Sequence, residues 1–190
     1  MVVVVIIAIM AVIAVPLFSA RFKAQRVLQV AGRVADLYRG SRTRALARGA
    51  ATLVTLDVGT GTLQVLEGVQ GTTAAKTNCA NLPTQGCLTN NWFNLGTSTA
   101  VGTARVIEGI SQQNITTTMT LPGASTLSSG TVALCFSPGG RTYVNSSGTW
   151  TADNWLPLTN VASITVADPS NSPRSYNILL MPNGTARLAP

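Results

Sequence analysis

The hydrophobic pattern divides the chain into three parts, and the first is the run MVVVVIIAIMAVIAVPLF at residues 1–18. The run contains no charged or hydrogen-bonding side chain. A helix that is apolar on every side must be buried in protein or in lipid. A helix of this length measures roughly 27 Å, close to the thickness of the hydrocarbon core of a bilayer. The pattern therefore predicts a membrane-spanning half of a helix over residues 1–20.

Two other interpretations of this run are a cleaved signal peptide and a buried core helix. A signal peptide opens with a basic segment and ends at a cleavage site before an unrelated domain. No basic residue precedes the run here, and a helical pattern continues directly beyond it. A core helix of this length with no polar position is unusual in a soluble domain. These points favour a retained membrane segment.

The second part, residues 21–49, has the pattern of an amphipathic helix. Apolar residues recur three and four positions apart, which places them on one face. Gly49 is a plausible helix stop. We therefore expect one long rod, with a membrane half followed by a half that packs on a domain through a single stripe. The stripe consists of Val27, Val30, Ala31, Val34, Leu37 and Tyr38.

From residue 50 the pattern changes to short, β-branched, alternating segments. The segments 51–58 and 62–68 flank Gly-Thr-Gly and indicate a hairpin, and a loop covers about 69–100. Gly139-Gly140 and Ser147-Gly148 are typical of turns. The spacing predicts a β-sandwich-like domain over residues 50–190 and an α+β fold class. The further predicted strands are 103–110, 114–122, 131–138, 141–145, 161–168, 175–182 and 185–190.

Charge is concentrated in one place. The net charge is +7, and residues 21–48 hold eight basic residues against Asp36 alone, so the entire excess lies directly after the apolar run. The basic flank begins with Arg21, Lys23 and Arg26. Such a cluster is attracted to anionic lipid headgroups or to acidic partner surfaces. DNA binding is the other functional interpretation, and a solvated or lipid-facing helix surface is the favoured one.

The three cysteines are Cys79, Cys87 and Cys135. The first two lie in the polar segment NCANLPTQGC, and their spacing is not that of a zinc site. We predict a disulfide between Cys79 and Cys87, which implies an oxidising compartment, with free thiols as the alternative. Cys135 lies in TVALCF, where an unpaired cysteine acts as a small core residue.

The sequence offers no catalytic constellation. The chain contains no His, which excludes a Ser/His/Asp triad and removes the commonest metal ligand. The segment after Gly59 lacks the later glycine and the lysine of a phosphate loop. The few carboxylates of the domain are scattered, so a paired-acid site has no local signal. We expect no enzyme activity, no cofactor, no metal and no small-molecule substrate.

The apolar run with its Pro16 resembles the N-terminal segment of type IV pilins and of the pseudopilins of type II secretion. In that family a G-F-T-L-I-E-L-type motif comes immediately before such a run. The resemblance implies that Met1 is not the natural start, and that a leader, an N-methylated phenylalanine and a glutamate precede it. It also implies that Pro16 kinks or locally melts the helix, because a mid-helix proline lacks a donor and clashes with the preceding turn.

The order of the later segments is similar to that of one group in this family. An Arg-rich stretch ending at Ala45–Gly49, an early hairpin, CFSPGGRTY at 135–143 and LLMPNGTAR at 179–187 resemble the GspH/FimT group of minor pilins and pseudopilins. The resemblance implies a single-pass protein of the bacterial inner membrane with a periplasmic β domain, later built into a fibre. Its implied partners are major and minor pilins, the inner-membrane assembly platform and membrane lipid.

The basic flank conflicts with this topology, since the positive-inside rule would place it in the cytoplasm. We follow the family topology because the cleaved leader carries the positive charge. The alternatives within the family are a type II secretion pseudopilus subunit and a pilin that binds DNA or a surface. Binding to nucleic acid is not expected, because only Arg174 and Arg187 lie near the C-terminal end, where DNA-binding members carry their basic residues.

The candidate site is therefore the apolar helix. Its small residues Ala8, Ala11 and Ala14 recur every three positions and could line a face of close approach to neighbouring helices. Val5 and Pro16 complete the predicted membrane and assembly helix. We expect fibre assembly, with a place in a priming or tip complex, to depend on these residues.

Overall fold

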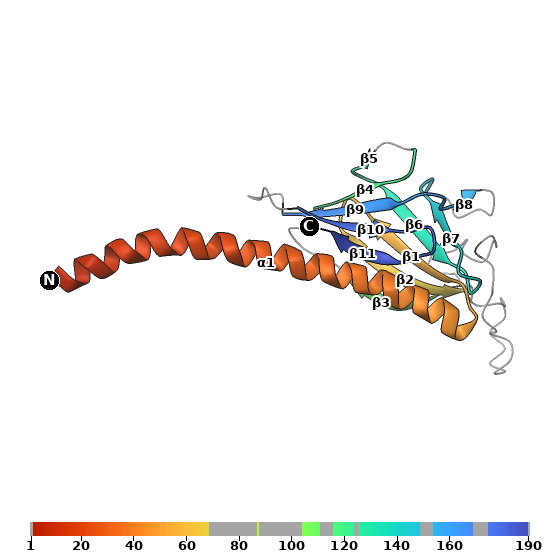
Figure 1. Cartoon of the computed structure of the whole chain (residues 1–190), viewed down its shortest axis with the longest axis horizontal. Coiled ribbons are helices and arrows are strands. Elements are labelled where there is room, and N and C mark those ends of the chain that lie inside the picture. Colours follow the sequence, from red (N-terminus) through yellow and green to blue (C-terminus); the bar gives the residue numbers. More distant parts are fainter. Residues whose placement is uncertain are drawn as a thin grey trace.

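The computed structural model describes residues 2–68, 87, 104–110, 116–123, 126–148, 154–168 and 175–189. Within these ranges, only the backbone is described for residues 104–110, for Lys23, for Glu67 and Gly68, and for residues 2–20 apart from Val3 and Met10. The described part consists of one long helix that lies alongside two β-sheets (Figure 1). The predicted α+β class, a long N-terminal helix on a sandwich-like β domain, is confirmed.

Helix α1 runs without a break from Val2 to Arg48. Gly49 follows it with a φ of 63°, a left-handed conformation that glycine adopts without the steric cost of a Cβ. The predicted stop is therefore confirmed. The helix continues through Pro16 and curves in its N-terminal half (Figure 1), so local melting at this proline is not observed. The division at residues 20 and 21 remains a prediction.

The first sheet is antiparallel and has the strand order β3-β2-β1-β6-β7-β8. Consecutive residues of its central strands β1 and β6 are buried. Because successive side chains of a strand point to opposite sides, both faces of these strands are covered. The strands are β1 (Thr52–Asp57), β2 (Thr62–Gly68), β3 (Ala104–Ile110), β6 (Thr131–Phe136), β7 (Thr142–Asn145) and β8 (Leu156–Pro157).

The second sheet is also antiparallel, with the order β11-β10-β9-β4-β5. Strand β9 alternates strictly between buried and partly exposed residues, so this sheet has one core face and one outer face. The strands are β4 (Thr116–Thr120), β5 (Thr126–Leu127), β9 (Ala162–Ala167), β10 (Ser175–Leu180) and β11 (Ala186–Ala189). The sequence pattern missed β5 and β8, which have two residues each.

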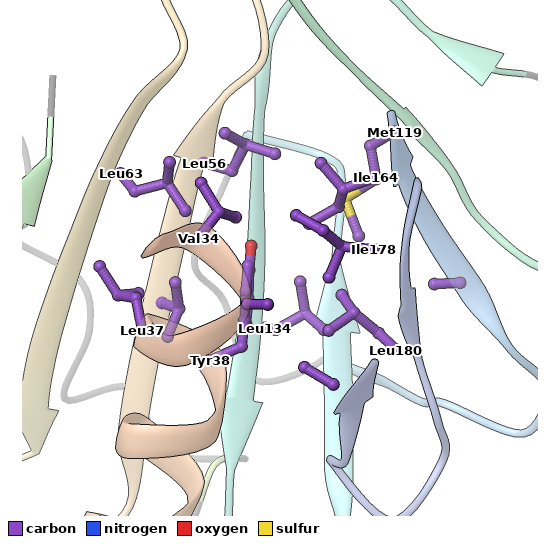
Figure 2. Packing of buried hydrophobic residues seen from close by; sticks show 14 of the residues in the cluster. Val34, Leu37, Tyr38, Leu56, Leu63, Met119, Leu134, Ile164, Ile178 and Leu180 are labelled. Atoms are coloured by element: carbon purple, nitrogen blue, oxygen red, sulfur yellow. The ribbon is translucent and has the colours of Figure 1, made fainter. Parts of the chain in front are cut away.

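The main core lies where the helix meets the inner faces of both sheets (Figure 2). The helix contributes its predicted apolar stripe, all of which is buried. Leu56 and Leu134 enter from the first sheet, and Ile164 and Ile178 from the second. Helix α1 contacts β1 and β6 of one sheet and β9, β10 and β11 of the other, so it covers the seam between them.

Two turns in the β domain have the same backbone design. In Ser137-Pro-Gly-Gly-Arg141, the Gly140 amide donates to the Ser137 carbonyl at 3.0 Å. In Met181-Pro-Asn-Gly-Thr185, the Gly184 amide donates to the Met181 carbonyl at 2.8 Å. Gly140 and Gly184 have φ values of 79° and 78°, which only glycine adopts readily. The prediction of a turn at Gly139-Gly140 is confirmed.

Candidate functional site

The N-terminal half of α1 projects beyond the β domain (Figure 1). The large apolar side chains described in this half are exposed to solvent: Val3 by 68%, Met10 by 67% and Phe22 by 67%. The buried stripe begins only at Val27. The projecting half therefore presents apolar surface that this chain does not itself cover.

The predicted assembly residues all lie on this projecting helix. Val5, Ala8, Ala11, Ala14 and Pro16 belong to α1, and their side chains are outside the described part of the structure. The structure thus places them together along one rod without showing what they contact. Across the residues that the structure describes, no helix is both long enough and apolar enough to cross a membrane.

The second half of α1 is fastened to the hairpin of β10 and β11 by two arginines. Arg39 Nε donates to the Ala186 carbonyl at 2.8 Å, and Arg42 Nε donates to the Asn183 carbonyl at 2.7 Å. Arg39 also pairs with Asp36 at 2.9 Å, with both side chains half-exposed or more. Hydrogen bonds from a charged donor are stronger than neutral ones, so these two arginines fix the helix against the second sheet.

The predicted basic flank is open to solvent where it is described. Arg21 and Arg26 are exposed, and the side chain of Lys23 lies outside the described part. In the C-terminal region, Arg187 is exposed on β11 and Arg174 lies outside the described residues. Of these two C-terminal arginines, the structure therefore describes only Arg187.

Tyr38 is the most polar member of the helix stripe. Its side chain is fully buried and its ring meets the ring of Phe136 edge to face, with centroids 6.4 Å apart. The hydroxyl has no hydrogen-bond partner among the described residues. Burial disfavours the charged phenolate and raises the pKa of Tyr38 above its usual range.

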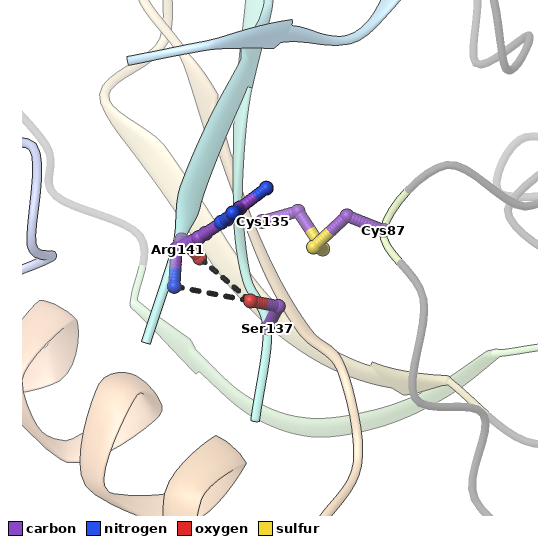
Figure 3. Close-up of a disulfide and its surroundings, with 4 residues drawn as sticks. All are labelled: Cys87, Cys135, Ser137 and Arg141. Atoms are coloured by element: carbon purple, nitrogen blue, oxygen red, sulfur yellow. Dashed lines mark hydrogen bonds between the residues drawn. A yellow bond between two sulfur atoms is a disulfide. The ribbon is translucent and has the colours of Figure 1, made fainter. Parts of the chain in front are cut away.

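The disulfide joins Cys87 to Cys135, with Cα atoms 5.8 Å apart (Figure 3). The predicted pairing of Cys79 with Cys87, and the predicted free thiol at Cys135, are therefore wrong. Cys79 lies outside the described residues. The physical reason is strand alternation: Leu134 points into the main core, so Cys135 points to the opposite face of β6, where Cys87 lies. The choice of face, rather than loop spacing, determined the pair.

A second apolar cluster surrounds this disulfide on the outer face of the first sheet. Leu53 of β1, Leu66 of β2 and Cys135 of β6 lie opposite one another in register, and Trp155 packs with them at 4% exposure. The first sheet is therefore covered on both faces. Trp155 therefore belongs to this core, whereas Trp92, Phe93 and Trp150 lie outside the described residues.

One open cleft of about 440 Å³ lies where the ends of β4, β7 and β8 approach one another. Leu121, Val144 and Leu158 form its apolar floor, and Ser146, Ser147 and Asn154 supply polar groups. None of its lining residues is charged. Within the described part of the chain, no group of three His, Cys, Asp or Glu residues could hold a metal ion. The described lining of the cleft therefore contains no side chain suited to acid–base chemistry.

No family model matches the chain, and no curated protein matches it. Among solved structures, it is similar to the type IV minor pilin FimU of Pseudomonas aeruginosa, with 12% identity and a TM-score of 0.45 over 87% of this chain and 90% of that one. It is also similar to the minor pseudopilin EpsH from the type 2 secretion system of Vibrio cholerae, with 14% identity and a TM-score of 0.41 over 90% of this chain and 95% of that one. The chain is thus similar to members of the two groups that its sequence resembles.

Proposed function

We propose that the chain is a structural subunit of a pilin-type fibre, a minor pilin or pseudopilin. The N-terminal half of α1 holds it in the inner membrane, and the β domain lies in the periplasm until the subunit enters the fibre. It catalyses no reaction. The observation that carries this proposal is the uncovered apolar surface of the projecting helix, at Val3, Met10 and Phe22.

Such a rod has few stable environments. Apolar surface of this extent in water marks a membrane or protein contact. The first twenty residues contain no charge, so lipid tails and the apolar helices of other subunits both suit them. Because lipid is as apolar as Val or Ile, the gain on leaving it for a fibre must come from close helix packing. Ala8, Ala11 and Ala14 are small residues, and we propose that neighbouring helices approach closely at these positions.

The disulfide supports the proposed location of the β domain. Disulfides form and persist in oxidising compartments such as the bacterial periplasm and are rare in the cytosol. The Cys87–Cys135 bond lies inside an apolar cluster, where it joins the first sheet to a distant segment. A domain built around this bond fits the periplasmic side of the membrane.

The test is Ala11→Phe in the full-length protein. The change raises hydrophobicity, so membrane fractionation and the folded β domain should be unaffected. It should impair incorporation into the fibre, because a neighbouring helix can no longer approach closely. Ile13→Phe, which replaces one large apolar side chain with another, is the matched control and should assemble normally. Pull-down with other minor pilins and a functional assay, twitching motility or protein secretion, give the readout.

Two results would contradict the proposal. Full-length protein that stays soluble without detergent would remove the membrane role. If Ala11→Phe assembles and functions normally, the helix serves only as a membrane anchor, and the contacts that bring the subunit into the fibre must lie in the β domain. Whether motility or secretion responds distinguishes a pilus subunit from the alternative, a type II secretion pseudopilus subunit.

A further inference from the structure

Three arginines form a straight row along one flank of α1. Arg26, Arg33 and Arg44 are seven and eleven residues apart. At 3.6 residues per turn these steps keep the three Cα positions within about 20° of one another around the helix, over roughly 27 Å along it. We call Arg26, Arg33 and Arg44 the arginine row.

Within the described part of the chain, the row differs from Arg39 and Arg42 in having no hydrogen-bonding or ion-pair partner. Arg26 and Arg33 are exposed and Arg44 is partly exposed. None of the three has a hydrogen bond or an ion pair with any described residue. Arg39 and Arg42 lie on the opposite flank, where they bind the carbonyls of Ala186 and Asn183. The row is therefore positive charge that lies parallel to the helix axis and that no described residue pairs with.

We propose that the arginine row is the docking surface for an acidic face of a different subunit in the fibre. This inference rests on the proposed function, because helices lie side by side in such a fibre. Charge complementarity decides the partner: a linear row of guanidinium groups fits carboxylates on a neighbouring helix or strand.

The same half of α1 in a second copy does not fit the row. Residues 21–48 contain eight basic residues and one acidic residue, Asp36, and Asp36 is already bound to Arg39. Two copies packed through this half of α1 would bring like charges together. Like-charge juxtaposition suppresses a pairing, so two copies should not pair with each other through this half of their helices.

Anionic lipid does not fit the whole row either. Along the helix axis, Arg33 lies roughly 22 Å and Arg44 roughly 39 Å beyond Phe18. The headgroup region adds only about 5–8 Å on each side of the hydrocarbon core. Lipid headgroups can therefore reach Arg21 and Lys23, whereas the far end of the row is too distant from an upright helix.

The experiment uses a copy of the protein as its own acidic probe. Full-length Arg26→Glu/Arg33→Glu/Arg44→Glu, the reversed-row probe, is mixed in detergent with fluorescently labelled wild-type protein, and pairing is measured by energy transfer. Mixed pairs should bind about threefold to a hundredfold more tightly than pairs of wild type or pairs of the probe. The preference should vanish in 1 M salt, where the Debye length is about 3 Å.

Two variants of equal net charge serve as matched binders for the probe. Arg26→Gln/Arg33→Gln/Arg44→Gln neutralises the row, whereas Gln25→Glu/Leu28→Glu/Thr43→Glu adds acid at exposed positions on another side of α1 and keeps the row. Each lowers the net charge by three. The variant with the neutral row should no longer bind the reversed-row probe, whereas the variant with the added glutamates should still bind it. Equal binding by both, or no preference for mixed pairs, overturns the proposal. Circular dichroism confirms that every variant is folded.

A vesicle-binding experiment tests whether the partner of the row is protein or lipid. Arg33→Gln/Arg44→Gln should bind phosphatidylglycerol–phosphatidylcholine vesicles as the parent does, and a tenfold loss would assign the row to lipid and overturn the proposal. In cells, the reversed-row protein should reach the membrane and fail to enter the fibre. Ala11→Phe tests fibre assembly without altering the row, and the mixed-pair measurement tests the row without requiring a fibre. Failure of the proposed fibre function and failure of the docking proposal can therefore be told apart.

Discussion

Replacing Gly184 with alanine tests how tightly the helix is fastened to the β domain. A Cβ at this position would lie 2.9 Å and 3.0 Å from two ring carbons of Phe136, and 3.0 Å from Arg42 Cδ. Phe136 is buried and touches Tyr38, while Arg42 is held by its bond to the Asn183 carbonyl. Neither neighbour can move without disturbing the contact between α1 and the β10–β11 hairpin.

Two costs add at Gly184. The φ of 78° costs an L-residue about 1–2 kcal/mol. Overpacking against a buried ring costs about 1–3 kcal/mol more. The expected destabilisation is therefore about 2–5 kcal/mol, measured as the free energy of unfolding in urea. At this chain length, each kcal/mol lowers the Tm by about 2–4 °C.

Gly140→Ala is an internal control for the first cost. Gly140 occupies the same position in an equivalent turn, has a φ of 79°, and its added Cβ would meet no atom within 4 Å. It should cost only about 1–2 kcal/mol. Phe136→Leu combined with Gly184→Ala should show a favourable coupling of about 1 kcal/mol, because the clashing ring is gone. If Gly184→Ala is no more destabilising than Gly140→Ala, the close approach of Phe136 and Arg42 does not constrain the fold.

Two further predictions concern buried groups. Replacing both Cys87 and Cys135 with alanine should lower the free energy of unfolding by about 4 kcal/mol, since the bond spans 48 residues, and non-reducing peptide mapping of the parent should find this linkage rather than one to Cys79. Tyr38→Phe should leave stability unchanged or raise it by about 1 kcal/mol, because the buried hydroxyl has no partner among the described residues. Because burial raises the pKa of Tyr38, the unfolded chain loses this proton first, so the parent should lose stability as pH rises above about 10 while Tyr38→Phe should not; equal loss in both would contradict this.

The elements that the sequence predicted correctly are those with a local period. The stripe from Val27 to Tyr38 is buried because three- and four-residue spacing makes one helix face. Strands such as β9 and β10 follow from short β-branched segments between turn residues. Both signals depend only on neighbours in the chain.

The features that the sequence did not predict depend on faces and on distant contacts. TVALCF is buried on both sides, so its pattern does not tell which face holds Cys135. The bonds from Arg39 and Arg42 reach carbonyls more than 140 residues away, and no local signal marks an arginine that binds a remote backbone. The seven- and eleven-residue spacing of the arginine row could have been found in the sequence. Only the structure shows that no described residue pairs with it.

The position of α1 across the seam of the two sheets has a mechanical consequence. In the proposed role, a subunit held in a fibre by its N-terminal half would bear tension along the helix axis. Since α1 packs on β1 and β6 as well as on β9, β10 and β11, a pull is shared between both sheets instead of reaching one edge strand. The close-packed stripe must slide as a whole before the domain detaches, because such interiors deform little and transmit strain. The position of α1 at the seam therefore means that the β domain resists such a pull in shear across its core, where many contacts must break together.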